Sequence, residues 1–304
     1  MDITPVGFGA WAIGGPWKYG WGEQDDTASV RTIHAALDAG VNWIDTAAIY
    51  GLGHSEEVVA KALKSTNKKP YIFTKCSMIW DDAGEVSHSL KTESVRREVE
   101  ASLRRLAVDT IDLYQIHWPN PDEELEEGWE TLTALQRDGK VRWIGVSNFS
   151  VSQLERCRAI APVTSNQPPL NLIRRDVTRE VLPYCAEYDI GVIVYSPMAS
   201  GLLTGRMSAE RVRRMDESDW RKRADAFNEP QLSRNLALAD LLTEIGRAHD
   251  ATAGEVAIAW TLRQPGVTAA IVGMRSPEQV AGVMHGGEIS LSDEEISRIE
   301  TFGA

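Results

Sequence analysis

The chain has 304 residues, of which 43% are hydrophobic, and a formal net charge of −12, so it can bury a large core as one barrel or as two ordinary domains. The acidic balance argues against a general nucleic-acid binder, which needs a positive face, and no apolar run is long enough to cross a membrane. No basic and apolar leader opens the sequence, and Cys76, Cys157 and Cys185 form no CxxC pair, so we expect a cytoplasmic protein with neither a nucleic-acid nor a membrane partner.

Strand-like and helix-like segments alternate along almost the whole chain. Short apolar runs rich in β-branched or aromatic residues predict strands at residues 6–9, 42–45, 71–74, 111–116, 143–147, 164–167, 191–196 and 268–273. Between and after them we predict helices at residues 26–39, 55–64, 92–106, 123–138, from 150 onward, 176–188, 232–249, 253–263, 277–284 and 293–301. A loop rich in glycine and tryptophan follows the first strand, and a long polar stretch at residues 206–229 interrupts the alternation.

Four of the predicted helix starts carry a capping box, in which a Ser or Thr is followed three residues later by Gln or Glu. The pairs are Ser150 with Gln153, Thr252 with Glu255, Ser276 with Gln279, and Ser292 with Glu295.

Eight strands that alternate with helices, without a linker rich in Ser or Pro, predict a single (β/α)8 TIM barrel over residues 1–304. The competing fold is a doubly wound sheet. In that fold, a G-x-G-x-x-G motif after the first strand would indicate a dinucleotide-binding site. The segment GFGAWA at residues 7–12 lacks the third glycine. The barrel is therefore the preferred fold.

Polar residues follow three successive predicted strands. Asp45 and Tyr50 come after the second strand, Lys75 after the third and His117 after the fourth. Because the carboxyl ends of parallel strands meet at one mouth of a barrel, we expect these four side chains to lie together. Each alone has an ordinary structural explanation, but charged groups that point into one mouth are costly without a use.

These residue types suit the chemistry of a carbonyl group. A tyrosine titrates near pKa ~10, so it needs help to act as an acid or base near neutral pH. The ammonium of Lys75 would stabilise the phenolate of Tyr50, the carboxylate of Asp45 would hold that ammonium, and His117 could polarise a carbonyl. A proton delivered to a carbonyl oxygen calls for a hydride to its carbon, and hence for a nicotinamide cofactor.

Seven segments carry a resemblance to a known family: DTAAIYGLGHSEEVVAKAL, FTKC, IDLYQIHWP, IGVSNFS, SNQPPLNL, VYSPMASGLLTG and VGMRSPEQ, in this order. Together they resemble the aldo-keto reductase superfamily over nearly the whole chain, in particular its bacterial NADPH-dependent members of the stress-protein type. The resemblance implies a (β/α)8 barrel that reduces aldehydes or ketones with NADPH. It also implies that Tyr50 is the proton donor, that Lys75 and Asp45 tune it, and that His117 orients the carbonyl.

The resemblance places the cofactor NADPH/NADP+ as well. Ser147, Asn148 and Gln167 match the partners of the nicotinamide amide, and Tyr195 matches the aromatic residue that stacks on the nicotinamide ring. The loop at residues 196–205 has the small residues that a pyrophosphate cradle requires. Its cofactor-binding candidates are Ser196, Pro197, Met198, Ser200, Gly201 and Leu202.

The segment from Arg275 to Gln279 is the clearest anion site on physical grounds, and Gly273 just before it is a further cofactor-binding candidate. Ser276 is predicted to cap a helix with Pro277 at its first position, and Arg275 lies beside the exposed N–H groups of that helix end. An arginine there suits the 2′-phosphate that distinguishes NADPH from NADH. Close relatives usually carry an acidic residue and an asparagine shortly after this motif, where this chain has Gly282 and Val283. The sequence thus leaves open the adenine contacts and the strength of the NADPH preference.

Aromatic residues in loops on the predicted mouth side form the candidate substrate site. Trp17, Trp21, Trp80 and Trp118 would suit a small apolar or aromatic carbonyl substrate, although each could instead pack a loop. The polar stretch 206–229 is predicted to be a mobile flap or solvated loop over the cofactor. The chain begins near the family's first barrel strand, so we expect an incomplete N-terminal hairpin at the barrel floor.

Two other functions use the same residues. A Schiff-base lyase would employ Lys75 as nucleophile, although Asp45 disfavours this role by keeping the lysine charged. A binding module could hold the nucleotide as a redox sensor, as do the potassium-channel β subunits that resemble this family. No metal site is predicted from the sequence.

Overall fold

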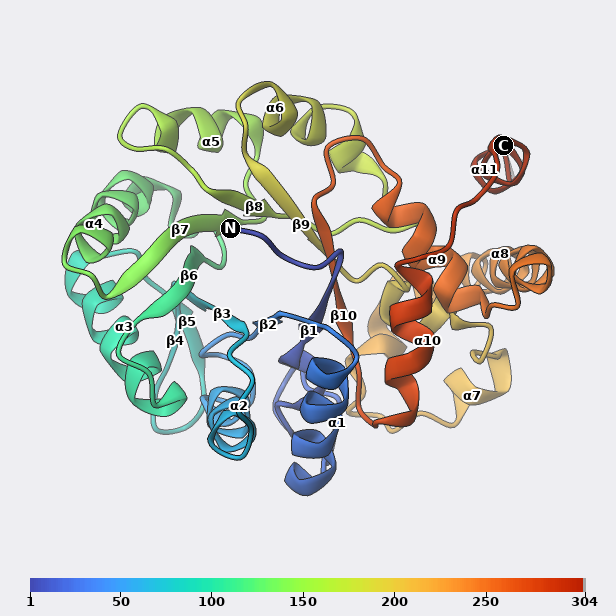
Figure 1. Cartoon of the computed structure of the whole chain (residues 1–304), viewed down its shortest axis with the longest axis horizontal. Helices are drawn as coiled ribbons and strands as arrows, with labels where there is room; N and C mark the ends of the chain where they lie inside the picture. The colour runs from blue at the N-terminus through green and yellow to red at the C-terminus, as the bar shows by residue number, and fades with distance from the viewer. Residues whose placement is uncertain (303–304) are drawn as a thin grey trace.

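The computed structural model describes residues 1–302, and its centre is a closed barrel of eight parallel strands (Figure 1). Around the barrel the strands follow the order β1-β10-β9-β8-β7-β6-β3-β2, and β2 closes the ring on β1. The barrel strands are β1 (Val6–Gly9), β2 (Trp43–Asp45), β3 (Tyr71–Cys76), β6 (Ile111–Ile116), β7 (Val141–Ser147), β8 (Ser165–Gln167), β9 (Gly191–Tyr195) and β10 (Ala269–Gly273). The predicted (β/α)8 TIM barrel is confirmed, and the doubly wound alternative is wrong.

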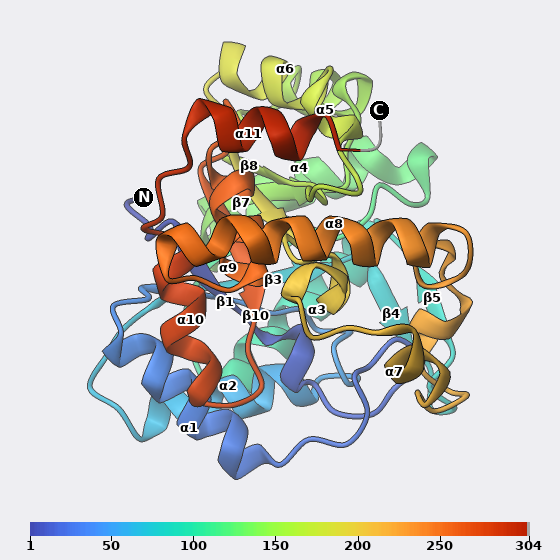
Figure 2. The same ribbon diagram turned by 90° about the vertical axis from the view of Figure 1, so that its right-hand side faces the viewer.

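Helices surround the barrel on its outside (Figure 1). They are α1 (Asp26–Asp38), α2 (His54–Lys64), α3 (Thr92–Leu106), α4 (Leu125–Arg137), α5 (Val151–Arg158), α6 (Val181–Glu187), α7 (Ala209–Arg213), α8 (Gln231–Gly246), α9 (Ala253–Leu262), α10 (Glu278–Gly286) and α11 (Asp293–Glu300). Short 3₁₀ turns join them: η1 (Ala10–Ile13), η2 (Asp122–Glu124), η3 (Asp176–Thr178), η4 (Ala199–Thr204), η5 (Trp220–Arg223), η6 (Asp225–Phe227) and η7 (Arg247–His249). Figure 2 shows α8 packed on α9, with α11 alongside α8.

Inward-pointing apolar side chains fill the part of the barrel that lies toward the amino ends of the strands. One buried cluster consists of Trp43, Phe73, Leu113, Ile193, Ala269 and Ile271. Gly7 makes room for this cluster, because a Cβ at position 7 would lie 2.2 Å from the indole ring of Trp43. The indole N–H of Trp43 donates to the carbonyl oxygen of Thr4 over 2.9 Å. Residues 1–5 therefore close the barrel floor, and they do so without forming a strand.

The inward-pointing side chains become polar two residues further along the strands. Side chains alternate between the two faces of a strand, so Asp45 shares the inward face of Trp43, and Lys75 shares that of Phe73. Strand pairing sets Lys75 beside Gln115, which is also buried. The alternation thus places a layer of polar side chains inside the barrel at the carboxyl ends of the strands.

The larger apolar core lies between the outward faces of the strands and the helices. Trp129 of α4 and Trp260 of α9 are among the largest fully buried side chains in it. Cys76, Cys157 and Cys185 are all free and buried. Among residues 1–302 no helix is both long enough and apolar enough to span a bilayer.

Two segments differ from the sequence-based expectation. An antiparallel hairpin of β4 (Met78–Trp80) and β5 (Val86–His88) follows β3, although the sequence analysis predicts no strands there. The polar stretch 206–229 is not a solvated loop throughout. It contains α7, η5 and η6, and its Val212 and Phe227 are buried in one cluster with Leu202 and Leu232. These apolar residues anchor the stretch to the body of the protein.

Three of the four predicted capping boxes are confirmed, at Ser150, Thr252 and Ser292. The box at Ser276 is wrong, because α10 begins after Pro277 and no side chain caps it. The side chain of Gln279 turns back to accept a hydrogen bond from the backbone N–H of Arg275 over 2.7 Å. It closes a loop before the helix rather than capping the helix.

Candidate active site

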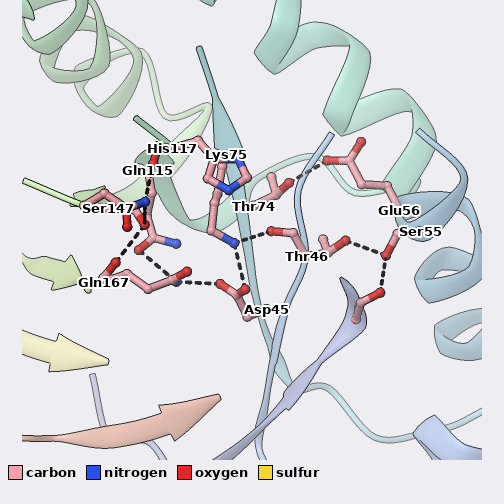
Figure 3. A network of polar contacts seen from close by, with 12 residues as sticks. Asp45, Thr46, Ser55, Glu56, Thr74, Lys75, Gln115, His117, Ser147 and Gln167 are labelled. Carbon is pink, nitrogen blue, oxygen red and sulfur yellow. Dashed lines mark hydrogen bonds and ion pairs between the residues drawn. The ribbon is translucent and has the colours of Figure 1, made fainter. Parts of the chain in front are cut away.

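A buried ion pair between Lys75 and Asp45 lies at the centre of the polar layer (Figure 3). The Nζ atom of Lys75 donates to Oδ1 of Asp45 over 2.7 Å and to the carbonyl oxygen of Thr46 over 2.8 Å. Burial lowers the pKa of Lys75, and the negative charge of Asp45 opposes that shift. Removing two charges from water is costly, so their close geometry and the additional hydrogen bond are needed to keep them there.

A line of hydrogen bonds runs from this pair across the mouth of the barrel (Figure 3). The second oxygen of Asp45, Oδ2, accepts from Nε2 of Gln167 over 2.8 Å. Backbone Gln167 O in turn accepts from the hydroxyl of Ser147 over 2.8 Å. The carboxylate of Asp45 is thus fixed on both oxygens by residues from β3 and β8.

A second set of hydrogen bonds fixes the loop between β2 and α2. The hydroxyl of Ser55 donates to the carbonyl oxygen of Ala10 over 3.0 Å and is bonded to the hydroxyl of Thr46 over 2.9 Å. The hydroxyl of Thr74 donates to the buried carboxylate of Glu56 over 2.6 Å (Figure 3). These contacts tie the start of α2 to β3 and to the turn after β1.

Tyr50 projects from this loop, and glycine is required beside it. Gly51 has a φ of +61°, and a Cβ there would lie 1.8 Å from the carbonyl oxygen of Gly14. The close approach of the two backbones turns Tyr50 toward the ion pair, with Nζ of Lys75 5.2 Å from its ring centroid. The ring of His117 meets that of Tyr50 edge-on, with centroids 5.7 Å apart. The structure therefore brings Asp45, Tyr50, Lys75 and His117 together.

The electrostatics of this group differ from the expectation that Lys75 draws the pKa of Tyr50 down. Burial and, next, the negative charge of Asp45 raise the pKa of Tyr50 well above its ordinary value of 10.0. The charge of Lys75 is paired with that of Asp45, so the ion pair as a whole does not bring the pKa of Tyr50 below its ordinary value. Burial, with the charge of Lys75, also lowers the pKa of His117 well below 6.5. At neutral pH the site thus holds a protonated phenol and an uncharged imidazole.

Asn148 and Tyr195 border the other side of the mouth. Asn148 adopts a φ of +64° and donates from Nδ2 to the carbonyl oxygen of His117 over 3.0 Å and to the hydroxyl of Ser147 over 3.1 Å. Its Oδ1 accepts from the hydroxyl of Tyr195 over 2.8 Å. Ser147, Asn148, Gln167 and Tyr195 therefore form one connected patch beside Tyr50.

A single cavity of about 1030 Å³ joins these residues. Nineteen of the candidate site residues line it: Trp17, Trp21, Asp45, Tyr50, His117, Trp118, Ser147, Asn148, Gln167, Tyr195, Ser196, Pro197, Met198, Ser200, Gly201, Gly273, Arg275, Ser276 and Gln279. Gly282 and Val283 line it too.

Three candidates are not part of the cavity lining. Lys75 is buried behind the wall, where it can act on other residues but does not reach a ligand. Leu202 points into the cluster with Val212 and Phe227. Trp80 lies on β4, with the guanidinium of Arg105 5.7 Å from its ring centroid.

Arg275 fastens a loop across the cavity, in an arrangement that we call the Arg275 clasp. Its Nε donates to Oε1 of Gln24 over 2.7 Å, and its Nη2 donates to the carbonyl oxygen of Glu23 over 2.8 Å. The side chain of Gln24 returns a bond to the carbonyl oxygen of Arg275 over 3.3 Å. The clasp therefore joins the loop that carries Trp17 and Trp21 to the segment before α10.

Sequence reasoning missed several residues of the cavity wall, namely Trp11, Met78, His88, Trp220 and Arg221. Trp11 directly follows the carboxyl end of β1, so the rule that located Asp45 could have located it too. Met78 and His88 belong to the unpredicted hairpin, and Trp220 and Arg221 to the polar stretch. Within residues 1–302 no group of His, Cys, Asp or Glu side chains is arranged to hold a metal ion.

Comparison with known proteins agrees with this geometry. Residues 5–304 match the model of the Aldo/keto reductase family. Aldo-keto reductase YhdN of Bacillus subtilis is 38% identical, with 99% of this chain and 90% of that protein covered. The NADH-specific methylglyoxal reductase of Escherichia coli is 30% identical, with 96% and 92% covered. The solved structure of the glycerol dehydrogenase AKR11B4 from Gluconobacter oxydans superposes with a TM-score of 0.91 at 40% identity and covers 99% of this chain and 92% of its own.

Proposed function

The chain belongs to the aldo/keto reductase family, whose members are oxidoreductases of small carbonyl compounds with nicotinamide cofactors, and we propose that it reduces an aldehyde or ketone to the alcohol with NADPH and with Tyr50 as proton donor. One observation carries the proposal: the phenol of Tyr50, the imidazole of His117 and the Lys75–Asp45 pair meet at one end of a large cavity.

The residues of the cavity suit a dinucleotide. The cavity volume of about 1030 Å³ lies at the upper end of the range of small-molecule sites, as a large ligand requires. Ser196, Ala199, Ser200 and Gly201 all have positive φ, and such a turn can present backbone N–H groups to a phosphate. When bound, NADPH supplies the hydride. We assign its nicotinamide end to Ser147, Asn148, Gln167 and Tyr195, and its phosphates to the 196–201 turn and the segment 273–279.

The protein's own part is to bind the carbonyl and to move a proton. The uncharged imidazole of His117 donates a hydrogen bond to the carbonyl oxygen and orients it toward Tyr50. The phenol of Tyr50 then gives its proton to that oxygen as the oxygen gains negative charge. The ammonium of Lys75, 5.2 Å from the Tyr50 ring centroid, stabilises the phenolate that is left behind. Asp45 and Gln167 keep Lys75 in place.

The same geometry disfavours a Schiff-base lyase. Lys75 does not line the cavity, and its Nζ is hydrogen-bonded to Asp45 and Thr46. A nucleophilic lysine would need an open path to the substrate.

An absorbance assay tests the proposed reaction. The purified protein is mixed with NADPH, or in parallel with NADH, and with a panel of aldehydes, and the loss of the reduced-nicotinamide band is followed. We expect aldehyde-dependent oxidation of NADPH. Tight binding of NADPH without turnover of any aldehyde would instead identify a redox-sensing module, and borohydride trapping of a substrate adduct would identify a lyase.

Replacing Arg275 with alanine is expected to weaken NADPH binding by about ten- to a hundredfold, since hydrogen bonds to a charged group contribute about 1.5–3 kcal/mol. NADH lacks the 2′-phosphate, so its Kd should change by no more than about twofold. The Kd of each nucleotide is measured by fluorescence titration.

The matched control is Gln24→Ala, which removes the two hydrogen bonds of the Gln24 side chain to Arg275 but keeps the guanidinium and its bond to Glu23. It should leave the ratio of the two nucleotide affinities unchanged. Equal losses of NADPH and NADH affinity in Arg275→Ala would show that Arg275 holds the loop and not the 2′-phosphate. This comparison has particular weight because the Escherichia coli relative is described as NADH-specific.

A further inference from the structure

Glu98 of α3 is a buried carboxylate that does not line the cavity and has no part in the group around Tyr50. Its Oε2 accepts from the backbone N–H of Ser77 over 2.9 Å, and its Oε1 accepts from the hydroxyl of Ser94 over 3.1 Å. Within residues 1–302 it forms no ion pair, since Arg105 of the same helix pairs with Glu56 instead. A carboxylate without a counter-ion is costly to bury, so its presence here calls for an explanation.

Ser77, the residue that Glu98 holds, connects three segments at the barrel mouth. It directly follows β3 and has a φ of +84°, a conformation that is unfavourable for a residue other than glycine and persists only where contacts hold it. Its hydroxyl is hydrogen-bonded to both backbone groups of Trp118, over 3.2 and 3.3 Å, and its carbonyl oxygen accepts from the N–H of Ser89 over 3.1 Å. Bonds to an ionised group are stronger than neutral ones, so the carboxylate of Glu98 is the strongest support of this backbone.

The peptide between His117 and Trp118 is held from two sides. Its N–H donates to the hydroxyl of Ser77 over 3.3 Å, and its carbonyl oxygen accepts from Nδ2 of Asn148 over 3.0 Å. The imidazole of His117 itself has no hydrogen bond to the described chain and meets the ring of Tyr50 edge-on. The direction of the imidazole therefore depends on how its backbone is held, and reaction rates depend steeply on such placement.

The charge of Glu98 changes near neutral pH. Burial raises the pKa of Glu98 from 4.5 to about 7, and the hydrogen bonds from Ser94 and Ser77 oppose this shift. The titratable and charged groups around it are Arg97 and Arg105 of α3, Glu56 of α2, Cys76 of β3 and Tyr114 of β6. Burial raises the pKa of the thiol and of the phenol as well, so both stay neutral. Below about pH 7 the carboxyl group is neutral and holds the N–H of Ser77 less strongly.

We propose that Glu98 is a positioning residue: its carboxylate holds Ser77, and Ser77 in turn holds the peptide that directs His117 toward Tyr50. The inference rests on the proposed reductase function and deepens it, because it adds a control of that site from the helix layer outside the barrel. The ionised form of Glu98 fixes His117 more firmly than the neutral form does. Reduction is then faster above the pH at which this carboxyl group ionises.

The test follows the single-turnover rate of NADPH oxidation between about pH 6 and pH 8, with the best aldehyde of the panel at saturation. In the wild-type protein the rate should rise about fivefold with a midpoint at about pH 7, as Glu98 ionises. Glu98→Gln keeps an acceptor for Ser77 and a donor for Ser94 but stays neutral, so its rate should remain at the low-pH value. The pKa values of His88 and His117 are lowered, so neither imidazole should titrate near pH 7.

Two further variants separate the route through Ser77 from a general effect of a buried charge. Ser77→Ala keeps the backbone bond to Glu98 but removes the hydroxyl that reaches Trp118, so the rate should be low and independent of pH. Asp112→Asn is the matched control. The carboxylate of Asp112 accepts from the N–H of Ile72 over 2.8 Å and burial raises its pKa, but it lies near the start of β6, at the opposite end of the barrel. This variant should retain the wild-type profile.

Stability distinguishes positioning from a structural role. The pKa of Glu98 is raised in the folded protein, so stability falls as pH rises toward about 7, and Glu98→Gln should be at least as stable as the wild-type protein at about pH 8. A variant that is slower only because it is much less stable in urea would overturn the proposal.

A wild-type rate that does not change between about pH 6 and pH 8 overturns the proposal by itself. A Glu98→Gln profile that rises like that of the wild-type protein overturns it as well, while the reductase function stands. If Glu98→Gln does not fold, the profile of Ser77→Ala decides in the same way. Absence of NADPH oxidation with every aldehyde of the panel would contradict the proposed function and, with it, the role of Glu98.

Discussion

Replacing Tyr50 with phenylalanine is expected to lower kcat for aldehyde reduction by about 10²- to 10⁴-fold, the range that positioned proton transfer contributes. The phenol is the one acid placed between His117 and the Lys75–Asp45 pair, and phenylalanine keeps the ring but removes the proton. The Kd of NADPH should change by no more than about twofold, since the ring remains in place. Single-turnover absorbance measurements separate the chemical step from cofactor binding.

The control for this substitution is Tyr19→Phe, which removes a phenol from another part of the cavity wall. Equal turnover by Tyr50→Phe and the wild-type protein would show that Tyr50 is not the donor. The pH profile gives a second check. The pKa of Tyr50 is raised, so its protonated form persists as pH rises through the neutral range and is lost only above that raised value. The rate of reduction should therefore not fall between about pH 6 and pH 9.

Lys75→Met is expected to reduce the free energy of unfolding by about 3–5 kcal/mol, because it leaves the buried carboxylate of Asp45 without its cation. It should also abolish most of the activity, since the phenolate of Tyr50 would then form beside an uncompensated negative charge. Urea denaturation, followed by tryptophan fluorescence, measures the stability. Lys61→Met is the matched control: Lys61 pairs with Asp26 over 2.6 Å but is 55% exposed, so its loss should cost less than about 1 kcal/mol.

The double variant Lys75→Met with Asp45→Asn separates the effect of the ion pair on stability from its effect on activity. Removing both charges should recover much of the lost stability, because no unpaired buried ion remains. Activity should not recover, since the ammonium is still absent. Equal destabilisation by Lys75→Met and Lys61→Met would mean that the buried pair contributes no more than a surface pair.

The sequence predicts the barrel well because its physical signals are local. Each strand is a short apolar run, and the alternation along a strand fixes that Asp45 and Lys75 face inward once Trp43 and Phe73 do. The convergence of three strand ends on one mouth then follows from the parallel arrangement. These signals are sufficient to place Asp45, Tyr50, Lys75 and His117 together from the sequence alone.

The remaining features depend on tertiary contacts that no local pattern encodes. The strands β4 and β5 have only three residues each, which is too short for a strand pattern to be recognised, so His88 could not be placed. The capping box at Ser276 satisfies the sequence rule, but Gln279 finds a better-placed donor in the backbone N–H of Arg275. The direction of the Tyr50 pKa shift depends on how completely the ring is buried and on how far Asp45 neutralises Lys75, and both are properties of the assembled site.

The Arg275 clasp makes the two ends of the cavity thermodynamically dependent on each other. The guanidinium of Arg275, beside α10, donates two hydrogen bonds, one to the carbonyl oxygen of Glu23 and one to the side chain of Gln24. The clasp leaves the other N–H donors of the guanidinium for an anion, so an anion at Arg275 would bind a side chain that also holds the loop bearing Trp17 and Trp21. Linkage is reciprocal, so the free energy by which the loop opposes or assists the anion equals that by which the anion shifts the loop. If the proposed nucleotide binds at Arg275, its affinity and the position of this loop are linked, and substrate selectivity should then be measured at a stated cofactor concentration.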